Sequence, residues 1–152
     1  MAQIAKVEVQ VEVKSSAETF YEVYRGKQYL WPKICPDIVK SVKLIKGDWD
    51  SIGSVKEWTF VAGNSETAKE MVEAIDEKNK TITLKILDGE AKKHYKNIKT
   101  TLQVTGMDQR GSLVKLSMEY EKQNDDTPVP TKYLEAFKFL AKSIDAYLTK
   151  NA

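Results

Sequence analysis

Residues 131–150 read TKYLEAFKFLAKSIDAYLTK and form the most regular stretch of the chain. Apolar side chains return there at intervals of three and four, as one face of an α-helix requires. Such a helix is roughly 30 Å long, enough to cross a small domain. A helix with one apolar stripe needs a surface to pack against, and the preceding sequence predicts a sheet. The stripe contains Tyr133, Phe137, Leu140, Ile144 and either Tyr147 or Leu148.

The chain before this helix predicts seven strands. From Ile4 to Val13, apolar and polar side chains alternate, which indicates a strand with one face toward the core. The links between the later strands are short and rich in turn residues. Because a parallel crossover needs a dozen residues or more, these links predict antiparallel neighbours. The further strand-like runs are Val39 to Lys46, Ser54 to Val61, Thr67 to Asp76, Thr81 to Asp88, Tyr95 to Thr105 and Ser112 to Lys122.

Two short helices are expected between the first and second strands. Ser15 and Glu18 match a capping box, so we expect a helix from there to about Tyr24, ended by Gly26. A second helical piece, from Gln28 to Ile34, ends before Pro36.

Length and charge limit the classes of function. The 152 residues fit one domain, residues 1–152. The 24 basic and 22 acidic residues give a net charge of +2 and are interspersed, so we expect no nucleic-acid partner. We find no apolar run that could span a membrane and no signal peptide. Cys35 is the single cysteine, which excludes an internal disulfide. We therefore expect a cytoplasmic monomer without membrane insertion.

The predicted elements indicate an α+β fold, in which a curved antiparallel sheet wraps around the C-terminal helix. Such a sheet has more inner surface than one helix fills. Its inner side chains are mostly apolar with a few amines and hydroxyls, a mixture typical of a small-molecule site. On periodicity alone a fully packed core is the commoner outcome. These inner side chains are Lys56, Trp58, Phe60, Ile82, Leu84, Ile86, Ile98, Thr100, Leu102, Leu116, Met118 and Tyr120.

Several segments together carry a resemblance to a known family. They are YLWPKICPDI (Tyr29 to Ile38), GDWDSIGSVKEWTF (Gly47 to Phe60), EAIDEKNKTITLKILDGE (Glu73 to Glu90), HYKNIKTTLQV, GSLVKLSMEYEK and the closing IDAYL. From end to end the chain resembles the plant major latex proteins of the wider Bet v I family. These are class-ten pathogenesis-related proteins and include the major birch pollen allergen. The combination of GDW, GSV and a tryptophan-bearing strand is more similar to the latex-protein branch.

The resemblance implies a helix-grip fold, Bet v I-like and START-like, with a seven-stranded sheet around a large cavity. It implies a carrier or reservoir linked to defence and stress, without a cofactor. The implied ligands are hydrophobic or amphipathic: plant hormones, flavonoids, sterol-like or fatty molecules. This favours a pocket over a packed core. The expected cavity residues are Phe20, Trp31, Lys56, Trp58, Phe60, Ile82, Leu84, Ile86, Ile98, Thr100, Leu102, Leu116, Met118, Tyr133, Phe137 and Leu140.

Two alternatives to a carrier stay open. Some family members catalyse condensations with a lysine, a tyrosine and carboxylates, and here Lys56, Glu73 and nearby tyrosines motivate an enzyme. The sequence does not place such a set together, so we expect no catalytic residues. A ligand-gated interaction module is the second alternative. Cys35, His94 and the scattered carboxylates lack metal-ligand spacing, so we expect no metal site.

Overall fold

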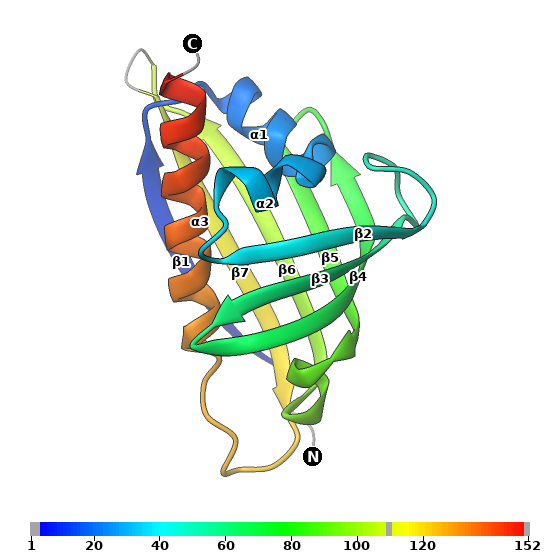
Figure 1. Cartoon of the computed structure of the whole chain (residues 1–152). Helices are drawn as coiled ribbons and strands as arrows, with labels where there is room; N and C mark the ends of the chain where they lie inside the picture. The colour runs from blue at the N-terminus through cyan, green and yellow to red at the C-terminus, as the bar shows by residue number, and fades with distance from the viewer. Residues whose placement is uncertain (1–3, 109–110, 151–152) are drawn as a thin grey trace.

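A computed structural model describes residues 4–108 and 111–150. Seven antiparallel strands form one sheet in the order β1-β7-β6-β5-β4-β3-β2, which bends around the C-terminal helix α3 (Figure 1). The strands are β1 (Ala5–Val13), β2 (Val39–Lys46), β3 (Val55–Ala62), β4 (Asn64–Asp76), β5 (Thr81–Gly89), β6 (Tyr95–Gly106) and β7 (Ser112–Lys122). The helices are α1 (Ala17–Gly26), α2 (Trp31–Ile34) and α3 (Thr131–Lys150), with 3-10 turns η1 (Gln28–Leu30) and η2 (Glu90–Lys93).

The sheet is an antiparallel meander, except that the first strand pairs with the last. Strands β2 to β7 pair in chain order, and β1 pairs with β7, from Ala5 opposite Tyr120 to Val13 opposite Ser112. In Figure 1, β2 and β3 run almost across the direction of β1 and β7, so the sheet is strongly bent. The predicted α+β fold with an antiparallel meander is confirmed.

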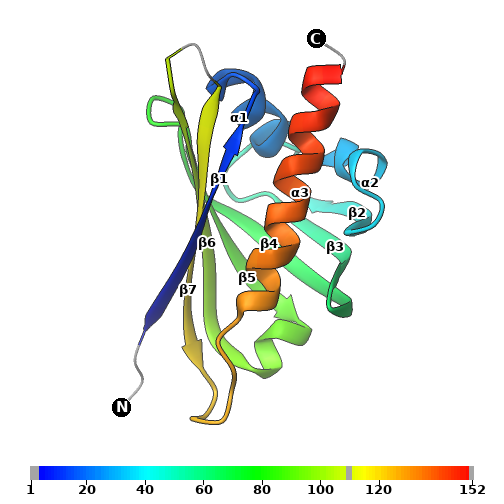
Figure 2. The same cartoon turned by 90° about the vertical axis from the view of Figure 1, so that its left-hand side faces the viewer.

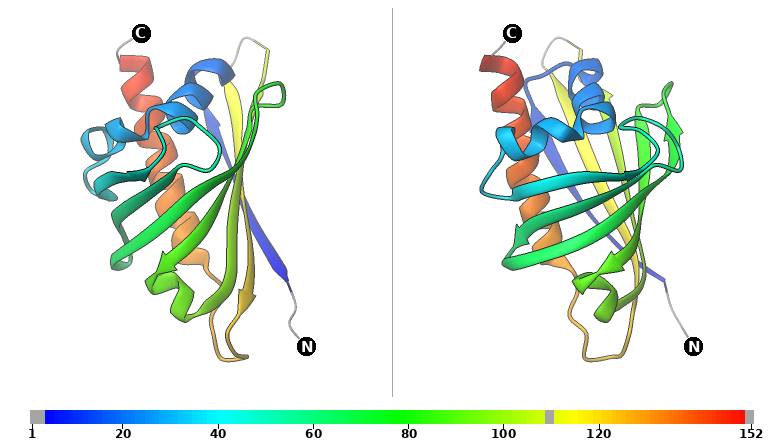
Figure 3. Two further views of the ribbon diagram at one scale, coloured as in Figure 1. Left: turned by 90° about the vertical axis from the view of Figure 1, so that its right-hand side faces the viewer. Right: turned by 45° about the vertical axis from the view of Figure 1, so that its right-hand side comes forward.

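Helix α3 lies along the concave face of this sheet. Its buried side chains are Leu134, Phe137, Leu140, Ala141 and Ile144, at the spacing that the sequence predicts. Figures 2 and 3 place α1, α2 and α3 on the concave side of the sheet. The interior is therefore enclosed by the sheet on one side and by the three helices on the other.

The start of α1 differs from the prediction. Ser16 is the N-cap residue, and its Oγ accepts a hydrogen bond from the backbone N of Thr19. Ser15 instead contacts α3, where its backbone N and its Oγ both donate to Asp145. A serine that caps a helix and one that makes a tertiary contact look alike in a sequence, so the predicted capping box of Ser15 and Glu18 is wrong.

A tight turn at Gly63 sets the register of β3 and β4. Gly63 has a φ of +82°, a backbone conformation that favours glycine, and Ala62 pairs directly with Asn64 across it. Strand β4 thus begins at Asn64, earlier than the predicted Thr67, and pairs along all of β3. This register decides which side chains of β4 face the interior.

Asp145 links α3 to the segment between β1 and α1. Its carboxylate accepts hydrogen bonds from the backbone N of Lys14 and from the backbone N and Oγ of Ser15. We expect Asp145→Ala to lower the free energy of unfolding by about 2 kcal/mol, because hydrogen bonds to charged groups stabilise more than neutral ones. Urea unfolding measures this change. Asp125→Ala, in an exposed loop, should change stability by less than about 0.5 kcal/mol. Equal losses for both variants would contradict the link.

Candidate functional site

A cavity of about 160 Å³ lies inside the protein, between α3 and the inner face of the sheet. All three α-helices and strands β2 to β7 contribute to its wall, which is mostly aromatic and aliphatic. Among the described residues, Glu70 is the one charged side chain on this wall. The lining residues are Tyr24, Trp31, Ile38, Val39, Trp58, Phe60, Ala68, Glu70, Leu84, Ile86, Thr100, Leu116, Met118, Tyr133, Ala136, Phe137 and Leu140.

Packed side chains fill the interior on either side of the cavity. On one side, α1 covers the start of β5: the Tyr21 hydroxyl donates to the Thr81 carbonyl at 2.9 Å, and the neighbouring Ile82 is buried. On the other side, a second apolar cluster includes Tyr95 and Tyr120, whose ring centroids lie 5.5 Å apart. The cavity occupies the space between these two packed regions.

Aromatic rings reduce the volume of the cavity. The ring centroids of Tyr24 and Trp31 are 4.8 Å apart, those of Trp31 and Trp58 5.0 Å, and those of Tyr24 and Phe137 6.1 Å. The cavity is thus smaller than the roughly 300–1,000 Å³ of sites for drug-sized ligands, and smaller than the large cavity that the resemblance implied. It is close in size to an engineered cavity of about 150 Å³ that binds benzene. It therefore has room for a single ring.

Glu70 introduces a titratable group into this apolar wall. In the β3–β4 ladder Lys56 lies opposite Glu70, and Trp58 lies opposite Ala68. Burial raises the pKa of Glu70 to about 7, and the Lys56 ammonium and the Trp58 indole N–H oppose this rise. Near neutral pH the carboxyl is therefore divided between its protonated and ionised forms.

Lys56 is buried on the same face of the sheet as Glu70, but its ammonium reaches the β2–β3 loop and does not line the cavity. Its Nζ donates to the carbonyl of Trp49, in the β2–β3 loop, at 3.2 Å. It also lies 5.8 Å from the centroid of the Trp49 ring. Burial lowers the pKa of Lys56, while the nearby carboxylates of Glu70, Asp48 and Asp50 oppose this change. The ammonium thus stabilises the loop and can influence Glu70 only through its charge.

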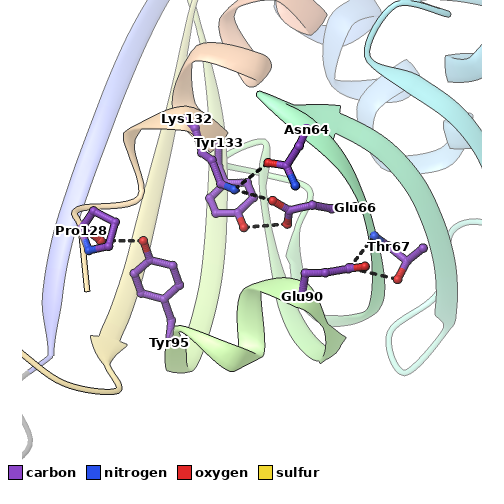
Figure 4. A network of polar contacts seen from close by, with 8 residues as sticks. All are labelled: Asn64, Glu66, Thr67, Glu90, Tyr95, Pro128, Lys132 and Tyr133. Atoms are coloured by element: carbon purple, nitrogen blue, oxygen red, sulfur yellow. Dashed lines mark hydrogen bonds and ion pairs between the residues drawn. The ribbon is translucent and has the colours of Figure 1, made fainter. Parts of the chain in front are cut away.

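A polar network joins the first turn of α3 to β4 beside the cavity (Figure 4). Glu66 is 2% exposed and accepts hydrogen bonds from the Tyr133 hydroxyl at 2.7 Å and from Lys132 Nζ at 2.5 Å. Lys132 Nζ also donates to Asn64 Oδ1 at 3.3 Å. Burial and the Glu66 carboxylate raise the pKa of Tyr133. The Tyr133 ring lines the cavity, but its hydroxyl is occupied by Glu66.

Other kinds of site find little support in the structure. Within residues 4–108 and 111–150, no three His, Cys, Asp or Glu side chains are grouped closely enough to hold a metal ion. Of the helices in the same ranges, none combines the length and the apolar character needed to cross a membrane. His94 is exposed, and Cys35 is a buried free thiol.

Comparison with known families identifies the chain. The family model described as the pathogenesis-related protein Bet v 1 family matches residues 2–151. The chain belongs to the Bet v 1 family. The resemblance predicted from the sequence segments is thus confirmed.

Individual relatives of this Bet v 1 family protein support the same family assignment. MLP-like protein 34 of Arabidopsis thaliana is 36% identical over 144 residues, which cover 93% of this chain and 46% of that relative. The chain thus spans about half the length of that protein. The crystal structure of ginseng major latex-like protein 151 from Panax ginseng aligns with a TM-score of 0.90 and 30% identity, covering 95% of this chain and 97% of that one. These likenesses confirm the predicted helix-grip fold and the similarity to major latex proteins.

An enzyme shares the fold as well. Norcoclaurine synthase from Thalictrum flavum, solved in complex with dopamine and hydroxybenzaldehyde, aligns with a TM-score of 0.78. The alignment covers 99% of this chain and 90% of that one, at 20% identity. At this identity the likeness concerns the fold and not the activity.

Most of the predicted site residues of this Bet v 1 family protein lie on the cavity wall: Trp31, Trp58, Phe60, Leu84, Ile86, Thr100, Leu116, Met118, Tyr133, Phe137 and Leu140. That they bind a ligand stays a prediction.

Five predicted site residues do not line the cavity: Phe20, Lys56, Ile82, Ile98 and Leu102. Phe20, Ile82 and Leu102 are almost fully buried in the main core cluster, and Ile98 belongs to the second cluster. Lys56 points to the β2–β3 loop. Alternation along a strand shows which face a side chain is on. It does not show whether that part of the face is packed.

Sequence reasoning missed six wall residues: Tyr24, Ile38, Val39, Ala68, Glu70 and Ala136. The enzyme hypothesis relied on Glu73, which instead forms an ion pair with Lys99 at 3.0 Å. The sequence contained a pattern from which the inward position of Glu70 could have been predicted. If Gly63 is taken as the centre of a tight turn, Trp58 pairs with Ala68, and the inward face of β4 then includes Glu70.

Glu70 predicts a pH-dependent effect on stability. Its pKa is higher in the folded chain than the usual value of about 4.3, so ionisation destabilises the folded state as pH rises toward and past about 7. Gln cannot ionise. We expect Glu70→Gln to gain stability relative to the unmodified chain between pH 5 and pH 8, by up to about 3 kcal/mol.

Urea unfolding at both pH values measures this difference, with Glu73→Gln on the same strand as the matched control. Glu73 is partly exposed and ion-paired, so its variant should show a much smaller change with pH. The assignment fails if the two variants follow the same pH trend.

Proposed function

We propose that this protein binds small hydrophobic or amphipathic molecules in its central cavity and acts as a carrier or reservoir in defence or stress responses. The observation that carries the proposal is the cavity itself, an apolar space at the centre of the fold with one carboxylate on its wall. Membership of the Bet v 1 family and the similarity to major latex proteins support it. Apolar walls supply affinity, and a few polar groups fix the orientation of a ligand.

The size of the cavity decides which ligands can enter without movement of the wall. A volume of about 160 Å³ receives a single ring without movement of the wall. Hormones, flavonoids and sterol-like compounds with several rings need more space. Their binding requires the rings of Tyr24, Trp58 and Phe137, which narrow the cavity, to move.

A fluorescent amphiphile tests the proposal. The rings of 8-anilinonaphthalene-1-sulfonate exceed the volume of the cavity, so we expect it to bind with saturable fluorescence only as the wall rings move, and to be displaced by flavonoids or hormones. Ala136 lines the cavity, so Ala136→Leu should fill it and weaken binding about tenfold. Ala146→Leu, on an exposed position of the same helix, should leave binding unchanged. Absence of displaceable binding to the folded protein would disprove the carrier function.

An enzyme is the second candidate, and Glu70 is the observation that favours it. A carboxyl group with a pKa of about 7 beside a cavity is suited to proton transfer near neutral pH. Lys56 points to the loop, and the Tyr133 hydroxyl is occupied, so no partner for Glu70 is in place. We expect no condensation product from dopamine and hydroxybenzaldehyde. A product that disappears in Glu70→Gln would favour the enzyme instead.

We also propose that the protein works as a monomer in the cytoplasm. The single cysteine, Cys35, is a buried free thiol, which suits a reducing compartment. Light scattering on the eluting protein gives the oligomeric state, and a fluorescent fusion in plant cells gives the compartment. A dimer, or a secreted fusion, would contradict this proposal.

A further inference from the structure

One polar group on the cavity wall, the indole N–H of Trp58, lacks a hydrogen-bond partner of ordinary geometry among the described residues. Trp58 is 6% exposed. The carboxylate of Glu70 lies on the same wall. Trp58 and Glu70 are diagonal neighbours across the β3–β4 ladder, so their side chains project from the same face of the sheet.

The two groups make only a weak contact with each other. The indole N–H acts on the Glu70 carboxyl as a hydrogen-bond donor and lowers its pKa, but the contact lacks the length and angle of an ordinary hydrogen bond. Lys56 on β3 also lowers the pKa of Glu70, and burial together with Glu70 raises the pKa of Tyr24 on α1. Lys56 donates to the Trp49 carbonyl, away from the cavity. A donor and an acceptor thus face the same space, and the weak contact between them leaves room for a better partner.

Buried polar groups without partners are costly, so a ligand that supplies the missing hydrogen bonds gains affinity. A hydroxyl group both accepts and donates. One hydroxyl between the two side chains would accept from the Trp58 N–H and donate to the Glu70 carboxylate. A methyl group at the same place would satisfy neither. A carboxylate would meet the negative charge of Glu70.

We propose that the cavity selects compact, neutral ring compounds that carry a hydroxyl, with Trp58 and Glu70 as the pair that recognises this group. The inference rests on the proposed function, because it names the ligand class of the same cavity. The volume of about 160 Å³ limits the ligand to a single ring, and the other wall residues contact its apolar part.

Phenol, toluene and benzoate test the proposal, because they share a ring and differ in one substituent. Isothermal titration calorimetry at about pH 8 measures their affinities, with Glu70 mainly ionised. We expect phenol to bind about tenfold tighter than toluene, and benzoate to bind weakest. Toluene that binds as tightly as phenol, while both bind in the cavity, would overturn the selection but leave the carrier function intact.

Matched variants show whether the two side chains cause the preference. In Glu70→Leu and in Trp58→Phe, the ratio of phenol to toluene affinity should fall to about one, because each change removes one hydrogen bond. Glu73→Leu and Trp49→Phe make the same changes away from the cavity wall and should keep the ratio. If Glu70→Leu does not fold, Glu70→Gln replaces it, with a reduced ratio expected. A ratio that is unchanged in the Glu70 and Trp58 variants would overturn the assignment.

The proposed function and this inference fail in different ways. If phenol and toluene neither bind nor displace the fluorescent amphiphile, the cavity is not a binding site, and both proposals fail. If toluene and the amphiphile bind without a preference for phenol, only the recognition by Trp58 and Glu70 is wrong.

Discussion

Helix α3 contacts the concave face of the sheet along one stripe, from Leu134 to Ile144, and this stripe is narrower than the bent surface it covers. A straight helix cannot follow a curved sheet over its whole width. On either side, α1 and the cluster around Tyr95 and Tyr120 fill the remaining space. Large aromatic side chains occupy the region between them and reduce the volume of the cavity without filling it. The cavity is thus a consequence of how a helix and a curved sheet pack.

Two glutamates on β4 illustrate two uses of an inward carboxylate. Glu66 and Glu70 are four residues apart and face the same side of the sheet. Glu66 is fully engaged by Lys132 and Tyr133, and it holds α3 against the sheet. Glu70 has only the more distant influence of Lys56 and Trp58, and burial leaves its pKa near 7. A paired buried charge fixes structure, whereas an unpaired one is retained at a cost to stability, as at many binding sites.

Much of the fold could be predicted from the sequence, because alternation and helical spacing directly reflect which side chains are buried. The strands β2 and β7 have the predicted bounds, and Phe137, Leu140 and Ile144 face the interior as expected. The errors concern polar residues with partners far away in the chain. Ser15 resembled a helix cap but bonds to Asp145, and Glu70 on an inner face was not among the predicted site residues. The cavity volume depends on the packing of individual rings such as Trp31 and Trp58, which no periodic pattern contains.

Polar contacts attach α3 near both of its ends. Glu66 holds Lys132 and Tyr133 in the first turn, and Asp145 holds the link between β1 and α1 near the last turns. Neither end of the helix can swing outward without breaking hydrogen bonds to a carboxylate. A guest therefore exchanges without an outward swing of α3, past the aromatic rings that line the cavity. The residence time of a bound molecule would then depend on the motion of these rings and not on movement of the helix.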